Sequence, residues 1–157
     1  MEVLSAWSIL NLATGIPIAS GIQSDQRYFY RMNSYFGGVN LLLSGIGYFS
    51  ARKKPGQPVS LTQALKKQNK LERVFLINTG LDLAYILGGL YWREKGQHKT
   101  GLEHDKALGY GNSIMLQGGF LFFFDGIQYT LHRKNGNNLR KINVEVAPGR
   151  LSLTLNL

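Results

Sequence analysis

Four apolar segments, each about as long as a membrane-spanning helix, divide the chain and limit the folds open to it. They cover residues 3–23, 32–50, 74–92 and 108–131. A helix needs about 20 residues to cross the ~30 Å hydrocarbon core of a bilayer. The 18 Lys and Arg residues avoid the first 26 positions and gather in or beside the connectors. This pattern predicts an all-α fold, a bundle of four transmembrane helices.

A soluble four-helix bundle is the competing interpretation. Helices of soluble bundles carry a charged face at helical spacing, and the first, second and fourth segments carry none. Charged residues make up only 17% of the chain, against roughly 25% in ordinary soluble domains. The membrane interpretation is therefore favoured.

An internal repeat organises the segments in pairs. Residues 37–53 and 118–134 align without a gap and share seven identities, and LNLA at 10–13 matches LDLA at 81–84. We therefore expect two tandem helical hairpins, repeat 1 over residues 1–54 and repeat 2 over 72–134, in one bundle domain, 1–135. Such a repeat either forms a binding site on its pseudo-two-fold axis or merely doubles a packing unit.

The connector and the tail carry local structural signals. Ser60 and Gln63 form a capping box, which predicts a helix that starts at Leu61 and continues into the third span. The tail, residues 136–157, alternates apolar and polar residues on both sides of Pro148-Gly149. Period-two alternation around such a turn predicts a short β-hairpin-like tail.

The net charge of +9 raises the question of a nucleic-acid partner, but no basic face with interleaved aromatic residues is visible. We expect no nucleic acid and attribute the charge to flanks of membrane spans. Twelve basic residues fall on the side of the 2–3 connector and the tail, and six on the other side. The positive-inside rule then predicts that both termini are cytoplasmic.

Polar residues at one depth are the candidate site. Asp82 and Asp125 both lie ~12–14 Å from the same basic boundary, at 1.5 Å per residue, and Asn11 and Ser44 fall at a similar depth. Asn78 shares a helix face with Asp82. We predict a ligand-binding or ion-binding layer formed by Asp82, Asp125, Asn11, Ser44 and Asn78. Purely structural hydrogen bonding between helices is the alternative.

No catalytic residues, metal ligands or cofactors are predicted. The chain has no Cys, which excludes thiolate metal sites and cysteine nucleophiles. No P-loop, dinucleotide fingerprint or zinc-protease motif occurs. His98 and His104 lie six residues apart in a connector, an arrangement more typical of a solvated loop than of a metal site.

The segments RYFYRMN (27–33), QNKLERVFLINTGLDLAYILGG (68–89) and LQGGFLFFFDG (116–126) resemble an uncharacterised family of bacterial four-helix membrane proteins of the Bacteroidota and their relatives. The resemblance spans about residues 3–135. It implies a bacterial protein, which with the charge bias predicts the inner membrane. Because that family has no known function, the resemblance assigns no site residues.

We therefore expect a non-enzymatic integral membrane protein, an accessory or scaffold subunit that packs against partners. Its partners would be the lipid bilayer and other membrane subunits or further copies of itself. The alternative is a small transporter or ligand-binding membrane protein that uses the layer around Asp82 and Asp125. An enzyme acting on lipid or quinone is the weakest alternative.

Overall fold

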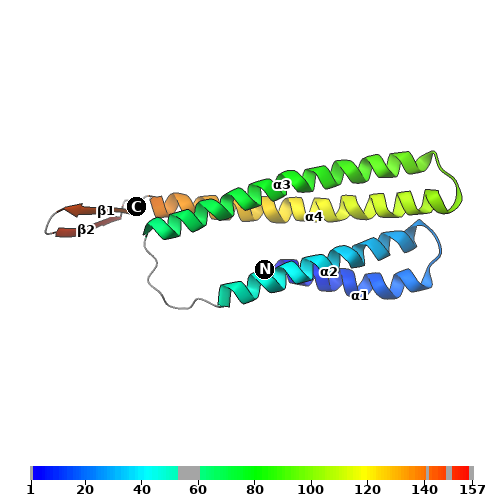
Figure 1. Ribbon diagram of the computed structural model, residues 1–157, viewed down its shortest axis with the longest axis horizontal. Coiled ribbons are helices and arrows are strands. Elements are labelled where there is room, and N and C mark those ends of the chain that lie inside the picture. The colour runs from blue at the N-terminus through cyan, green and yellow to red at the C-terminus, as the bar shows by residue number, and fades with distance from the viewer. Residues whose placement is uncertain (1, 53–60, 141, 148–149, 156–157) are drawn as a thin grey trace.

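The computed structural model describes residues 2–52, 61–140, 142–147 and 150–155. Within these ranges the chain forms four helices followed by two strands (Figure 1). The helices are α1 (Glu2–Gly21), α2 (Asp25–Arg52), α3 (Leu61–Gln97) and α4 (Gly101–Arg140). β1 (Ile142–Ala147) pairs antiparallel with β2 (Arg150–Leu155). The expected helical hairpins are thus present, and α3 begins at Leu61 as predicted; Ser60 and Pro148-Gly149 lie outside the described residues.

Short turns with suitable residues reverse the chain inside each hairpin. Ser24 precedes α2, and its hydroxyl accepts a hydrogen bond from the backbone N–H of Gln26 at 3.3 Å, which satisfies an unpaired donor of the first turn. Gly101 begins α4 with a φ of 59°, a conformation that a side chain disfavours. Both turns are too short for anything but antiparallel neighbours.

The two hairpins lie side by side, with their turns at the same end of the molecule (Figure 1). Helix α1 packs on α2, α3 packs on α4, and α2 packs on α4 to join the hairpins. At Gly109 the start of α2 comes so close that a Cβ atom would lie 2.8 Å from the backbone nitrogen of Phe29. At the other end, α3 and α4 extend beyond α2 (Figure 1).

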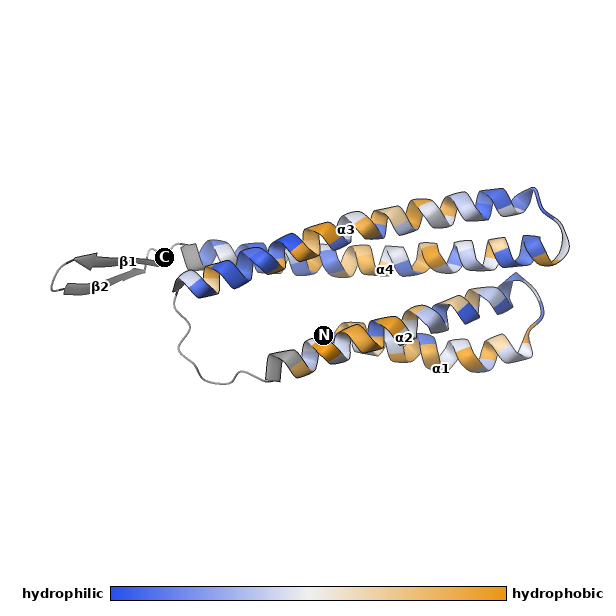
Figure 2. Ribbon diagram, viewed as in Figure 1, coloured by the Kyte–Doolittle hydropathy of each residue, from blue (hydrophilic) through white to orange (hydrophobic). Residues whose placement is uncertain are grey.

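Polar and apolar side chains are distributed in the reverse of a water-soluble core. The buried apolar residues described are Leu4, Ala107 and Ile114, whereas the buried polar ones are Ser8, Asn11, Asn33, Asn40, Ser44, Asp82, Ser113, Gln117 and Asp125. Large apolar side chains point outward, with Leu42 and Phe123 each 70% exposed. Apolar residues dominate the middle of the hairpins, and the extended ends of α3 and α4 are hydrophilic (Figure 2).

Two of the four helices are long and apolar enough to cross a membrane, judged by length and composition alone. Among the described residues, Glu2–Gly21 and Thr62–Gln97 each contain an 18-residue stretch with a mean hydropathy of 1.4. Helices α2 and α4 do not reach that hydropathy. The prediction of a four-helix, all-α bundle is therefore confirmed, and the prediction that all four helices cross a membrane is not.

Small residues set the closest contacts inside both hairpins, at positions that match. A Cβ atom at Gly15 would lie 2.7 Å from the carbonyl oxygen of Tyr30, and one at Gly89 would lie 2.7 Å from that of Gly111. A second matching pair consists of Gly37, which faces Ser8 and Asn11, and Gly118, which faces Asp82 and Tyr85. These contacts make Asp82 of the second hairpin the structural equivalent of Ser8 in the first. The sequence alignment, which pairs Asp82 with Asn11, is shifted by three residues, almost one helical turn.

Candidate functional site

A pair of buried carboxyl groups lies between α3 and α4. Asp82 is 3% exposed and Asp125 is 6% exposed. Their side chains share a hydrogen bond, and Asn78, one turn before Asp82, hydrogen-bonds Asp125. An ionised carboxylate only accepts hydrogen bonds. The two carboxyl groups can share a hydrogen bond only when one of them is protonated.

One oxygen of this pair has no partner. Oδ2 of Asp82 is fully buried and makes no hydrogen bond within the described part of the chain, and the same is true of Nδ2 of Asn40 on α2. A buried polar atom without a partner costs about 1–3 kcal/mol. The free oxygen of Asp82 is therefore a place where a proton, a cation or a water molecule would be stabilised.

A second polar cluster, the amide cluster, ties α1, α2 and α4 together around Gln117, which is fully buried. The indole N–H of Trp7 donates to Oε1 of Gln117 at 2.8 Å. The amide nitrogen of Gln117 donates to Oδ1 of Asn11 at 2.8 Å and to Oδ1 of Asn33 at 2.9 Å. Ser113 also donates to Asn33, at 2.6 Å. The amide cluster thus satisfies its polar groups internally.

The predicted polar layer therefore divides into separate groups. Asp82, Asp125 and Asn78 come together as expected. Asn11 joins the amide cluster instead, and Ser44 accepts a hydrogen bond from Ser5 of α1 at 3.0 Å. By the glycine contacts, Ser8 and Ser44 of the first hairpin occupy the places of Asp82 and Asp125 in the second.

Sequence reasoning missed the other members of the amide cluster. Gln117 is one polar residue among several in the apolar segments, and Trp7, Asn33 and Ser113 carry no signal of their own. The one usable hint is the spacing of Asn33 and Asn40. Seven residues apart, they lie on one face of α2, and both are buried.

Charged and ring-bearing side chains near the helix ends make separate pairwise contacts and do not form a cluster within the described residues. Lys99 donates to Glu103 at 3.1 Å, and this hydrogen bond lowers the pKa of that carboxyl group. His104 lies 3.3 Å from Asp105. The ring of His132 stacks on Phe75 at 5.3 Å. No group of three or more His, Cys, Asp or Glu suited to a metal ion occurs among the described residues.

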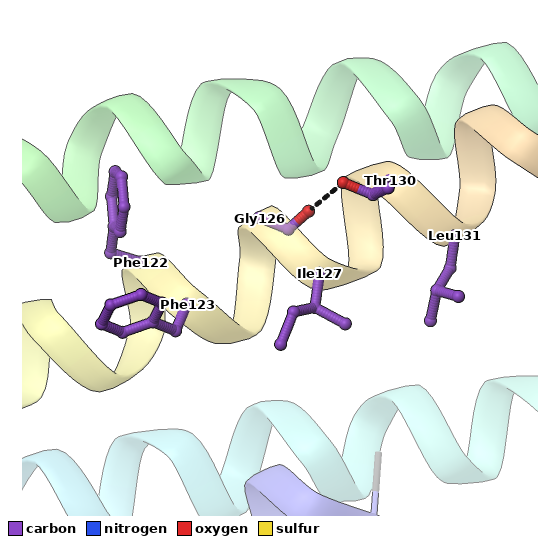
Figure 3. Close-up of a pocket in the computed structure, with 6 residues that line it drawn as sticks. All are labelled: Phe122, Phe123, Gly126, Ile127, Thr130 and Leu131. Atoms are coloured by element: carbon purple, nitrogen blue, oxygen red, sulfur yellow. Dashed lines mark hydrogen bonds between the residues drawn. The ribbon is translucent and has the colours of Figure 1, made fainter.

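Grooves open on the surface of the bundle, and one of them is lined in part by the buried Ser44. One, of ≈ 300 Å³, is lined by Phe122, Phe123, Gly126, Ile127, Thr130 and Leu131 of α4. Phe123, Ile127 and Leu131 point away from α3 (Figure 3). Two others, of ≈ 410 and ≈ 440 Å³, lie along the contact between α1 and α2.

Comparison with known proteins adds one match. The model of the Family of unknown function (DUF6992) matches residues 3–126. No curated protein and no solved structure matches the chain. The matched range contains both polar clusters described above.

Proposed function

The chain belongs to the Family of unknown function (DUF6992), and we propose that it is a non-enzymatic integral membrane protein. In this proposal the four-helix bundle is an accessory or scaffold subunit that lies in the bilayer and packs against other membrane subunits or further copies of itself.

The reversed distribution of side chains carries the proposal. In water, monomers rarely expose contiguous apolar patches above a few hundred Å², yet all four helices expose large apolar side chains. In a bilayer those side chains face lipid at no cost. Small and polar residues then hold the helices together, as Gln117 and the paired glycines do here.

Helices α2 and α4 fit this proposal despite their lower mean hydropathy. Their polar residues, among them Asn33, Ser44 and Gln117, are buried against other helices. Their outward positions are apolar, as at Leu42 and Phe123. A span average adds both faces together, whereas the lipid contacts only the outer face.

The groove on α4 (Figure 3) supports the scaffold role. Its large side chains flank Gly126, where a Cβ atom would meet nothing within 4 Å. Such an open small residue between bulky neighbours allows close approach of another helix. The internally bonded amide cluster favours a structural role for the buried polar groups.

Membrane extraction followed by native mass spectrometry tests both parts of this proposal. Membranes that contain the full chain are washed with alkaline carbonate and then solubilised in mild detergent. The protein should stay with the membrane until detergent is added and then form an assembly with other subunits or copies. Release by carbonate would refute membrane integration, and a strictly monomeric species would refute the scaffold role.

Single-cysteine labelling tests the proposed topology, because the chain has no Cys of its own. A membrane-impermeant maleimide added to intact cells should label Gln97→Cys, at the end of α3, and not Lys67→Cys, on its basic extension. The two positions are exposed in the structure. Labelling of Lys67→Cys but not of Gln97→Cys would contradict the proposal that both termini are cytoplasmic.

A transporter or ligand-binding role is the second candidate, favoured by the unpaired oxygen of Asp82. Proton or cation binding at this oxygen would engage the carboxyl group of Asp125 as well, because the two share a hydrogen bond. Asp82→Asn with Asp125→Asn should then abolish a bound ligand or a proton-dependent flux. Unchanged ligand content and flux would leave the aspartates with a structural role.

A further inference from the structure

The contact between α1 and α2 carries a groove lined by two arginines that form no ion pair within the described residues, and we call it the arginine groove. It has a volume of ≈ 410 Å³ and lies near the turn between the two helices. Its lining comes from α1 and α2, namely Gly15, Ile16, Ala19, Ser20, Arg27, Arg31, Ser34 and Tyr35. Arg27 and Arg31 are four residues apart, so their side chains lie on one helix face.

The guanidinium groups of both arginines are available to an anion. Neither Arg27 nor Arg31 lies within ion-pair distance of a carboxylate in the described part of the chain. Nε of Arg31 donates to the hydroxyl of Tyr35 at 2.9 Å, which fixes that side chain and leaves its terminal nitrogens for another acceptor. A pair of planar guanidinium groups matches the oxygens of a phosphate.

The same face of α2 continues from the arginine groove into an apolar track. Gly38 and Gly45 follow Arg31 at seven-residue intervals, and a Cβ atom at either glycine would meet nothing within 4 Å. Gly45 lines a second groove, of ≈ 440 Å³, together with Ile9 and Leu41. The hydrocarbon of one bilayer leaflet is ~15 Å deep. Because a helix rises 1.5 Å per residue, an acyl chain lying along α2 would reach about ten residues beyond Arg31.

We propose that the contact between α1 and α2 binds one anionic phospholipid, with its phosphate between Arg27 and Arg31 and an acyl chain along Gly38. The charge of the groove selects an anionic headgroup, and the apolar track that follows it selects a lipid over free phosphate. The proposal rests on the membrane location proposed above.

Native mass spectrometry of the detergent-solubilised full chain, titrated with phosphatidylglycerol or with phosphatidylcholine, tests the headgroup. The wild-type protein should retain phosphatidylglycerol in preference to phosphatidylcholine. Arg27→Gln with Arg31→Gln should weaken its binding about 30-fold, because each basic residue near an anionic lipid contributes about 1 kcal/mol. Arg93→Gln with Lys95→Gln is the matched control, since it removes two charges at the same end of the bundle and should bind like wild type.

A third variant tests the acyl track and separates lipid from free phosphate. A Cβ atom at Gly38 would meet nothing within 4 Å, so Gly38→Leu should be accommodated in the fold and should weaken phosphatidylglycerol binding. Titration with inorganic phosphate should not displace the lipid from the wild-type protein. Displacement by phosphate at lipid-like concentrations would reduce the site to a simple anion site and overturn the proposal.

The outcomes also distinguish this proposal from the membrane proposal. Release of the protein by alkaline carbonate would overturn the membrane location and this site with it. A protein that stays in the membrane while the double arginine variant retains phosphatidylglycerol as well as wild type does would overturn only the lipid site.

Discussion

The amide cluster provides the sharpest test of how this bundle is held together, through the substitution Gln117→Leu. Leucine has a similar size and prefers a helix as strongly as glutamine does, so the change removes mainly hydrogen bonds. Gln117 makes three of them, to Trp7, Asn11 and Asn33. After its loss, the Trp7 N–H and Oδ1 of Asn11 have no partner, while Asn33 keeps Ser113.

The loss of stability follows from these bonds. At ~0.6 kcal/mol for each hydrogen bond between membrane helices, three bonds give about 2 kcal/mol. The two groups left unpaired, the buried Asn11 and the half-buried Trp7, set an upper value of about 6 kcal/mol at up to ~3 kcal/mol each. A chain of this length loses roughly 2–4 °C in Tm per kcal/mol, so Tm should fall by at least ~4 °C.

Thermal unfolding in mild detergent, followed by circular dichroism, measures this change. Gln26→Leu is the control, because its side chain is exposed. In a Trp92→Phe background Trp7 is the only tryptophan, and its emission should shift to shorter wavelength once its hydrogen bond is lost. A Tm of Gln117→Leu no lower than that of Gln26→Leu would refute the argument that polar bonds hold these helices.

Three further outcomes follow from the close contacts and the carboxyl groups. Gly89→Ala should destabilise the protein by about 1–3 kcal/mol through overpacking, whereas Gly88→Ala, which meets nothing within 4 Å, should stabilise it by up to ~1 kcal/mol; equal melting temperatures would contradict the packing. Asp82→Asn should unfold near the wild-type temperature because its amide can donate to Asp125, and Asp82→Leu should unfold lower. The lowered pKa of Glu103 means that its bond to the lysine four residues earlier stabilises the fold at neutral pH and is lost as the pH falls through that lowered value. Glu103→Gln should therefore reduce the slope of an acid titration of stability, and an unchanged slope would argue against the bond.

The sequence predicted the elements better than the contacts between them. Apolar segments of helical length and the signals near Leu61 were sufficient for the helices and their pairing. Depth was also readable, because distance along a helix is fixed at 1.5 Å per residue, and Asp82 and Asp125 do meet. Depth says nothing of which way a side chain points around the helix axis, so Asn11 was placed in the wrong group.

The direction of a side chain around its axis depends on contacts that only packing reveals. Here Gly15 and Gly37 set the rotation of α1 against α2, and they turn Asn11 toward Gln117. Average hydropathy contains no information on side-chain direction either. It counts Asn33 and Gln117 against α2 and α4 without knowing that both residues face inward.

The hydrogen bonds of Gln117 reach across both hairpins, and this has a consequence for the order in which the protein assembles. Within lipid, apolar contacts discriminate poorly between neighbours, since a lipid tail serves a leucine as well as another helix does. In the proposed membrane location, each hairpin can enter the bilayer and close on its own glycines before it meets the other. The two hairpins then recognise each other when the Gln117 amide inserts between α1 and α2. These hydrogen bonds determine which hairpin is bound, how it is rotated, and at what depth it lies relative to the first hairpin.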